Sequence, residues 1–568
     1  MRYATVGLMT ASLILGCGSD STANVRRRGS ATGGLTNPVC VAGASAGAVQ
    51  APAFVRNIRG QTSWFASPVV ADLDHDGANE IVAAYYTLYV YDAAGNLLDS
   101  AEGNGSRIYA PHVVTDLEGD GITDIVVGQD HQVFAYEWRE GALHQKWVAS
   151  TESAGEQPEV LGMAAADLDG DDNIEVVATT TAGHDGAQVF VFDSSGGLFQ
   201  PVGTPYPAWP RYNDREGPGG DADRNGQGHH GFGCYGLNVG IGDIDGDPDL
   251  EIIVTYDNHA IQAFDPDGVA IDASPWFTNR SSENQGERLT WGQFIRWADP
   301  EVEENHYHLH TGEWPDINET EWLQWTASPP NVVDLNGDGL NEVVGVPNVE
   351  MHEPYETQAY AIMVLEGAHG DGSRSAMRLA GWETLPRGEA PVNVDGWYPP
   401  GGPPAAVTVD IQDDPRPEIV VSLNDAHMHA YDASGQEIWF RDYAHGKSIM
   451  YASEAAVADL DQNGSPEIVF ATYGDPDTSD SGRLMILAAN GDVRHDLALP
   501  DPGHNGNGNG APAAPTIADV DGDGQLEILV QTFDHGMDVF TVPGSGTGCV
   551  LWGTARGGPL RMGAPNGG

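Results

Sequence analysis

The sequence predicts an all-β protein built from a repeated unit. Three observations carry this prediction. An acidic loop with the pattern Asp-x-Asp-x-Asp-Gly-x-x-Glu recurs along the chain between short apolar runs. The 568 residues include 73 Gly and 36 Pro, which makes the chain rich in turns, and no long stretch has helical periodicity. Short apolar runs bounded by turn residues are typical of strands buried in stacked sheets.

The acidic loop has the donor set of a calcium site. In the copy Asp519–Glu527, acidic oxygens fall at positions one, three, five and nine, and Gly524 stands at position six. Calcium takes about six to eight hard oxygen ligands, which alternate residues of a tight loop can supply. An EF-hand would place its last glutamate at position twelve and flank the loop with helices, whereas here the acid is at nine and strands follow. The pattern therefore predicts a calcium-binding loop that connects two strands.

Eight copies of this loop recur, and seven of them retain nearly all the acidic positions. The predicted metal ligands are Asp72, Asp74, Asp76, Glu80, Asp116, Glu118, Asp120, Asp124, Asp167, Asp169, Asp171, Glu175, Asp243, Asp245, Asp247, Glu251, Asp334, Asn336, Asp338, Glu342, Asp459, Asp461, Asn463, Glu467, Asp519, Asp521, Asp523 and Glu527. The sixth copy, Asp410–Glu418, has Gln412 at position three and Arg416 at position seven, so we expect it to be the weakest site. The predicted cofactor is calcium at several sites.

The spacing of the copies predicts a β-propeller. Each unit continues as strand, turn, strand, Gly-containing hairpin and outer strand, and four short strands per unit are typical of a propeller blade. Eight units favour one propeller of eight blades over residues 51–568, with seven blades as the alternative. The widest gaps, near 200–237, 270–330 and 346–402, are expected to be insertions.

The repeated unit resembles the FG-GAP/VCBS repeat of integrin α-subunit-like propellers. The resemblance covers roughly residues 51–555 and rests on the acidic loop followed by Glu-Ile-Val. The Phe-Gly and Gly-Ala-Pro half is nearly absent, with only Gly510-Ala511-Pro512 matching it. The resemblance implies a propeller of seven or eight blades with calcium on the loops of one face. It favours the bacterial VCBS-like branch over integrin-style ligand recognition.

The N-terminus carries a targeting signal. Residues 1–17 combine Arg2, an apolar core and Ile14-Leu15-Gly16-Cys17, which resembles a bacterial lipoprotein cleavage box. Lipidation of Cys17 is predicted, followed by a flexible tether over 18–50; an ordinary secretory signal is the alternative. Gly18 after Cys17 favours the outer membrane or cell surface. We therefore expect an exported protein that meets the membrane only through its lipid anchor.

The charge balance limits the classes of partner. The chain has 83 Asp and Glu against 25 Lys and Arg, a formal net charge of −58. Binding to nucleic acid or to an anionic membrane surface requires Lys and Arg facing phosphate, so both are excluded as expected partners. Such a chain repels itself unless cations neutralise it, which again favours calcium. A monomer is expected.

Beyond Cys17 the chain has Cys40, Cys234 and Cys549, so at most one intramolecular disulfide can form. Cys40 and Cys549 lie near the two ends of the predicted propeller. A bridge between them would join its first and last elements, but the sequence leaves the pairing open.

Functional residues are expected on the insertions, because binding residues usually lie on loops held by a rigid scaffold. Residues 270–330 hold six of the 14 tryptophans: Trp276, Trp291, Trp297, Trp314, Trp322 and Trp325. They would either stack on sugar rings or close a satellite core. His306, His308 and His310 would share one face of a strand and could bind zinc or form a polar surface. The insertion Asp221–Gly231 could be a further metal loop or a lid.

We interpret the chain as a calcium-stabilised surface propeller that binds a protein or glycan partner in adhesion, and not as an enzyme. One alternative is a polysaccharide lyase acting on acidic glycans, since some propellers resembling this one have that activity. Such an enzyme needs a base and a cation beside the uronic carboxylate, for which His306, His308, Arg296 and Arg280 are candidates. The other alternative is a structural component of an envelope assembly.

Overall fold

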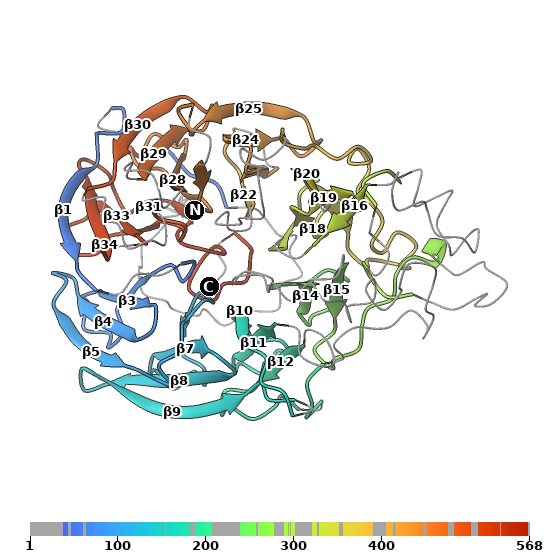
Figure 1. Cartoon of the computed structure of the whole chain (residues 1–568), viewed down its shortest axis with the longest axis horizontal. Coiled ribbons are helices and arrows are strands. Elements are labelled where there is room, and N and C mark those ends of the chain that lie inside the picture. The colour runs from blue at the N-terminus through green and yellow to red at the C-terminus, as the bar shows by residue number, and fades with distance from the viewer. Residues whose placement is uncertain are drawn as a thin grey trace, which may run out of the picture.

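The computed structural model describes residues 38–565 except 44–46, 61–63, 154, 182–187, 201, 207–238, 257–259, 278–288, 293–294, 296, 301–320, 326–328, 352–355, 390–404, 413–415, 447–449, 475–481, 501–508 and 534. The described residues form strands and one short 3-10 helix, η1 (Pro275–Phe277). Antiparallel sheets surround a central axis as an eight-bladed propeller (Figure 1). The predicted fold class and blade number are therefore confirmed.

Each blade is an antiparallel sheet of three or four strands in chain order from the axis outward. Blade one consists of β2 (Val69–Ala71), β3 (Glu80–Ala84), β4 (Leu88–Asp92) and β5 (Leu97–Ala101), and blade two of β6 (Val113–Thr115), β7 (Asp124–Gln129), β8 (Gln132–Arg139) and β9 (Ala142–Ser150). Blade three consists of β10 (Val160–Ala166), β11 (Glu175–Thr180) and β12 (Val189–Phe192), and blade four of β13 (Val239–Gly242), β14 (Glu251–Tyr256) and β15 (Ala260–Phe264).

Blades five to eight follow the same plan, and the last of them takes its outer strand from the start of the chain. Blade five consists of β17 (Asn331–Val333), β18 (Glu342–Gly345) and β21 (Met363–Glu366), and blade six of β22 (Val407–Val409), β23 (Glu418–Ser422), β24 (His427–Tyr431) and β25 (Glu437–Asp442). Blade seven consists of β27 (Ala456–Ala458), β28 (Glu467–Gly474), β29 (Arg483–Ala488) and β30 (Val493–Ala498), and blade eight of β32 (Thr516–Ala518), β33 (Leu526–Gln531), β34 (Met537–Val542) and β1 (Ala53–Ile58).

Burial explains why these sequences form blades. The second strands, such as β7 and β28, are buried along their whole length, while the outer strands β5, β25 and β30 consist of exposed and partly buried residues, apart from the buried Trp439 of β25. Clusters of buried apolar side chains lie between all neighbouring blades, including blades eight and one. The hydrophobic core is therefore a ring of interfaces between blades, and most of its residues come from the apolar runs beside the acidic loops.

The ring is closed by segments from both ends of the chain. β1 pairs with β34, and Asn57 Nδ2 donates a hydrogen bond of 2.8 Å to Asp538 Oδ1. At the other end, β35 (Val550–Trp552) pairs with the innermost strand of blade seven. A disulfide joins Cys40 to Cys549, with Cα atoms 5.6 Å apart. Of the segment expected to be a tether, Val49 is buried against blades seven and eight, so its described part is attached to the propeller.

The C-terminal residues 550–563, which we call the axial segment, run through the centre of the ring (Figure 1). Its carbonyls accept backbone hydrogen bonds from the inner strands of blade after blade: Gly553 from Ile517, Pro559 from Val114, Leu560 from Ala165, Met562 from Ile241 and Gly563 from Val332, at 2.8–3.2 Å. The axis of the propeller is therefore filled by the chain itself.

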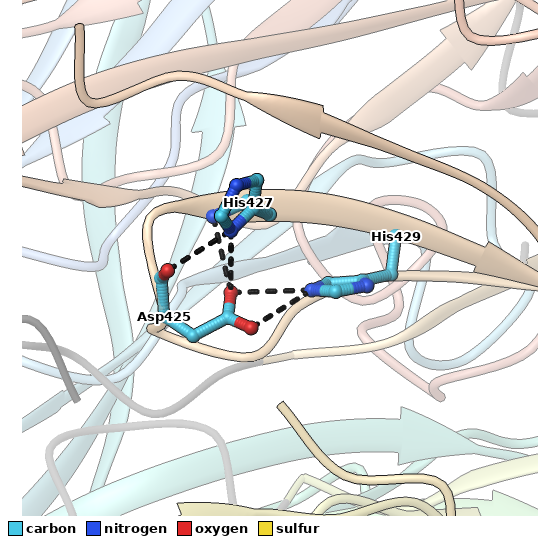
Figure 2. A group of neighbouring side chains, drawn as sticks. All are labelled: Asp425, His427 and His429. Atoms are coloured by element: carbon cyan, nitrogen blue, oxygen red, sulfur yellow. Dashed lines mark hydrogen bonds and ion pairs between the residues drawn. The ribbon is translucent and has the colours of Figure 1, made fainter. Parts of the chain in front are cut away.

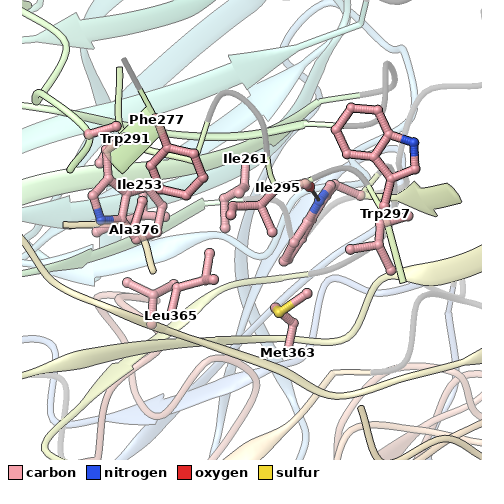
Figure 3. Close-up of a cluster of buried hydrophobic side chains, with 14 of the residues drawn as sticks. Ile253, Ile261, Phe277, Trp291, Ile295, Trp297, Met363, Leu365 and Ala376 are labelled. Carbon is pink, nitrogen blue, oxygen red and sulfur yellow. Dashed lines mark hydrogen bonds between the residues drawn. The ribbon is translucent and has the colours of Figure 1, made fainter. Parts of the chain in front are cut away.

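The insertion within 270–330 adds a satellite core against blades four and five. Trp291, Trp297 and Trp325 are completely buried there, packed with Ile253, Met363 and other apolar side chains (Figure 3). A small extra sheet of β16 (Trp322–Gln324), β19 (Asn348–Met351) and β20 (Glu356–Tyr360) accompanies it. For these three tryptophans the satellite core is confirmed and the sugar platform is wrong; Trp314 and the side chain of Trp322 lie outside the described residues.

Two short strands complete the described part of blade seven, β26 (Met450–Ala452) and β31 (Asn509–Gly510), and both pair with the extended end of β28. No helix in the described ranges is both long and apolar enough to cross a membrane.

Candidate metal loops and the opposite face

All eight acidic loops connect the first and second strands of a blade in the same register. The residue before the loop pairs with the acid at position nine, as Ala71 pairs with Glu80 and Ala518 with Glu527. Since the blades share one strand order, these loops lie on one face of the propeller, which we call the loop face. The turns between second and third strands and the connections between blades lie on the other face, which we call the turn face.

The acid at position nine holds each loop in shape. Its carboxylate accepts a hydrogen bond from the backbone N–H at position two, for example Leu73 to Glu80 at 2.9 Å and Val520 to Glu527 at 2.9 Å. The degenerate sixth loop keeps this bond, from Ile411 to Glu418 at 2.8 Å. One oxygen binds the backbone, and the other can have a separate partner, as Glu342 Oε1 does in accepting a hydrogen bond of 3.0 Å from Asn336 Nδ2. The sequence predicted this acid as a metal ligand, and the structure adds a role in folding the loop.

The aspartate at position one also accepts backbone hydrogen bonds. Asp72 accepts from the N–H groups of Asp76 and Gly77 at 3.0 and 2.9 Å, and Asp116, Asp334 and Asp459 repeat the pattern. Glycine at position six has a positive φ, 92° at Gly77 and 86° at Gly524, a conformation that a side chain would strain. The spacing of acids and glycine is thus explained by the loop backbone as well as by ligand geometry.

Electrostatics favour a cation inside these loops. Burial raises the pKa of Glu80 to about 7, of Glu175, Glu342 and Glu467 to about 8, and of Glu251 to about 9, and nearby aspartates raise each of them further. Ligand atoms from Asp72, Asp74 and Glu80 lie within 4.8 Å of one another, and the loops around Asp167 and Asp243 have equivalent groups.

Asp519 offers the clearest test of fit. Its Oδ1 atom is buried and has no hydrogen-bond partner among the described residues, although its Oδ2 accepts the N–H of Gly524. An unpartnered buried carboxylate oxygen is costly unless a cation binds it. The donor set of hard oxygens fits calcium, and the residues that would hold it are those at positions one, three, five and nine.

The second loop differs, because a lysine occupies it. Lys146 of β9 places Nζ 3.0 Å from Asp124 Oδ2 and in hydrogen-bond contact with Glu118. The ammonium therefore stands where the other loops would hold a metal, between two of the predicted ligands. The sequence did not predict this role of Lys146. The one feature that could have indicated it is that Lys146 is the single Lys or Arg on the outer strand β9.

The turn face has a different character. The Arg107 guanidinium carbon lies 5.2–5.5 Å from the ring centres of Trp64, Tyr85, Tyr86 and Tyr109. Arg107 also donates hydrogen bonds of 2.8 Å to the hydroxyls of Tyr86 and Tyr109. We call these five residues the Arg107 cluster. The cluster combines residues from the connections before and after blade one with residues from the turn between β3 and β4. No single stretch of sequence therefore predicts it.

The other predicted functional segments lie outside the described residues. These are the signal segment with Cys17, the insertion Asp221–Gly231, the histidines His306, His308 and His310, and the candidate cations Arg280 and Arg296. They remain predictions.

Known proteins share a repeat profile and a weak structural similarity with this chain. The sequence profile of the FG-GAP-like repeat matches residues 116–178 and 459–530. A comparison with curated proteins gives no match. Among solved structures, BamB from Moraxella catarrhalis is 12% identical with a TM-score of 0.43, covering 86% of this chain and 99% of BamB. The Dos1 propeller is 10% identical with a TM-score of 0.44, covering 87% and 96%.

A third similar structure is the rhamnogalacturonan lyase PL11 of Bacillus licheniformis, at 13% identity and a TM-score of 0.38, covering 87% of this chain and 91% of the lyase. These likenesses are to the fold alone. Both profile matches contain acidic loops with the register described above, and the sheets complete an eight-bladed ring. The chain is an eight-bladed β-propeller that contains FG-GAP-like repeats at residues 116–178 and 459–530.

Proposed function

We propose that this protein is an exported, calcium-stabilised propeller that binds a glycan partner through its turn face without transforming it. The observation that carries the proposal is the Arg107 cluster, in which four aromatic rings and a guanidinium gather at one place on that face. Aromatic rings stack on the apolar faces of sugars, and tyrosine hydroxyls and guanidinium groups bind the hydroxyls at their rims. Tyr86, Arg107 and Tyr109 are partly exposed.

Two further observations support parts of this proposal. The Cys40–Cys549 disulfide suits an oxidising compartment, which agrees with the predicted export signal. The loop face supplies calcium-type donor sets, and calcium there would tie the first two strands of a blade together and neutralise carboxylates that otherwise repel. In this scheme the loop face stabilises the scaffold and the turn face binds the partner.

The test is a glycan-binding screen followed by titration calorimetry with the best ligand. Tyr86→Ala and Tyr109→Ala should each weaken binding about five- to tenfold, since stacking and hydrogen bonding of one ring contribute about 1–1.5 kcal/mol. Tyr89→Ala is the matched control, because Tyr89 stacks on Tyr91 outside the cluster.

Three outcomes would contradict the proposal. One is the absence of any bound glycan, and another is binding that the cluster substitutions leave unchanged. The third is an ultraviolet-absorbing unsaturated product on incubation with polyuronides, which would favour the lyase. A protein partner captured on the same face and lost with Tyr86→Ala would keep the binding module and replace its ligand class.

A further inference from the structure

A second cluster on the turn face has a different chemistry from the acidic loops. Asp425 lies in the turn between β23 and β24, and His427 and His429 follow it on β24, on the same face of the strand (Figure 2). One ligand atom from each of the three residues lies within 4.8 Å of the other two. This Asp-x-His-x-His pattern spans five residues, as His306, His308 and His310 do, but no separate feature of the sequence indicated it.

His429 lies between two carboxylates, those of Asp425 and Glu437. Its Nδ1 lies 2.8 Å from Glu437 Oε1, while its Nε2 lies 3.1 Å from each oxygen of Asp425. A neutral imidazole carries one N–H, so it can donate to only one of these two carboxylates. The other contact needs either a second proton, on the ring or on a carboxyl group, or a metal ion shared with the carboxylate.

The geometry fits the metal. Zinc bonds of about 2.0–2.1 Å at a tetrahedral angle place two ligand atoms about 3.3 Å apart, close to the Nε2 to Asp425 separation. In metal sites the second ring nitrogen of a ligating histidine usually donates to a carboxylate, which orients the ring. Glu437 holds that position on His429, and Tyr431 and Phe440 flank the ring at centroid distances of 6.0 and 6.2 Å.

The site is built into the interface between blades five and six. The Asp425 carboxylate is 1% exposed and accepts backbone hydrogen bonds of 3.0 Å from His427 and from Glu389, which follows blade five. A Cβ atom added to Gly388 would lie 2.8 Å from Asp425 Oδ2, so the backbone approaches the carboxylate closely. The His427 side chain is 26% exposed and opens the cluster to solvent.

We propose that Asp425, His427 and His429 bind one divalent transition-metal ion of the zinc class. Imidazole nitrogens suit such ions, whereas calcium takes oxygen ligands, so this site is selective against the ion expected on the loop face. Blade six is also the blade whose acidic loop is degenerate. A metal at the turn face would stabilise the contact of blade six with blade five, at the opposite face from the degenerate loop Asp410–Glu418.

The experiment titrates the full chain, stripped of metal and then saturated with calcium, with Co²⁺ and Zn²⁺. It is done with His306, His308 and His310 replaced by Gln, so that this other histidine group cannot contribute. We expect one equivalent of Co²⁺ to give the absorption bands of a four-coordinate site, and Zn²⁺ to displace it. Glu437→Gln should weaken binding about 10–100-fold through loss of the orienting carboxylate.

His429→Ala should abolish binding, and His427→Gln, at the more exposed position, should weaken it at least tenfold while leaving the calcium-saturated melting temperature unchanged. His445→Ala is the matched control, because His445 pairs with a single carboxylate, Asp496, at 3.1 Å and should bind as the parent does. The proposal is overturned if the parent takes up no stoichiometric metal, which would leave His429 as an imidazolium between two carboxylates. It is equally overturned if folded His427→Gln and Glu437→Gln bind as tightly as the parent.

Discussion

At the residue scale, one acid in each loop performs two tasks. The carboxylate at position nine fixes the loop backbone by a hydrogen bond, as Glu175 does with the N–H of Leu168 at 3.0 Å, and it is also a predicted metal ligand. The sequence predicted the ligand role from spacing alone. It could not predict the backbone bond, because that bond depends on the register of the two strands that the loop connects.

Lys146 marks the limit of loop-by-loop reasoning. The second loop has a full set of acids and was predicted as a metal site like the others. The competing cation arrives from β9, where a bulge between Ala135 and Tyr136 shifts the pairing of β8 with β9. A side chain brought in by a bulge two strands away has no local signal in the sequence.

Replacing Lys146 by Met should therefore make the stability of the second loop depend on calcium. The variant leaves Asp124, 1% exposed, and Glu118 without their counter-ion, and we expect a loss of about 2 kcal/mol in free energy of unfolding in calcium-free buffer. Calcium should restore part of that loss, because the loop would then present an ordinary set of oxygen ligands. Denaturant unfolding with and without calcium measures both effects; equal stability of variant and parent in calcium-free buffer would show that the ammonium contributes nothing.

At the element scale, the axial segment replaces what would otherwise be an open channel. Arg556 is buried at its centre and donates to Asn331 Oδ1 at 2.7 Å and to the carbonyl of Pro330. Glu454 accepts hydrogen bonds from Trp552 Nε1 and from the backbone N–H of Arg556, both at 2.7 Å. These contacts join blades five and seven through the axis. The segment bonds once to each of several blades, so it has no periodicity by which the sequence could reveal it.

Arg556→Met tests the axial segment directly. The substitution keeps an unbranched apolar side chain but removes the donor to Asn331 Oδ1 and one of the two cations, Arg556 and Arg561, that act on the buried carboxylate of Glu454. We expect a loss of about 3–5 kcal/mol in free energy of unfolding, the range for breaking a buried charged network. Arg139→Met is the control, since Arg139 is half exposed in a surface ion pair with Glu137 and should cost less than about 1 kcal/mol. Similar losses in both variants would mean that the axial segment is not a stabilising element.

At the scale of the whole molecule, the repeat made the architecture predictable. Eight acidic loops with apolar flanks predicted eight blades, and every loop has the same strand register. The insertions were predictable as interruptions but not in their packing. Six tryptophans within 270–330 were compatible with both a core and a binding surface, and only the contacts of Trp291, Trp297 and Trp325 decide between them.

The acidic loops also predict how stability depends on pH. In calcium-free protein the folded pKa values of Glu175 and Glu251, about 8 and about 9, exceed the ordinary 4.5 of a glutamate. The folded state then binds more protons than the unfolded chain, so the free energy of unfolding falls as pH rises from about 5 to about 9. Saturating calcium should raise the melting temperature most at the alkaline end and remove this slope. Melting temperatures across that range in calcium and in calcium-free buffer check it; coincident curves would mean that the loops bind no calcium.

Ring closure by β1 and by the axial segment has a consequence for how the protein is made. Strand β1 (residues 53–58) pairs with β34, almost five hundred residues later in the chain, and the inner strands bond to the axial segment, which ends at residue 563. A nascent chain can assemble single blades, but β1 and the inner strands keep unpaired edges until residues 537–563 have left the ribosome. Contacts this distant in sequence slow folding, because the loop-closure entropy is lost before the contacts form. Completion of the ring therefore requires that residues 537–563 have been synthesised and can reach the first blades.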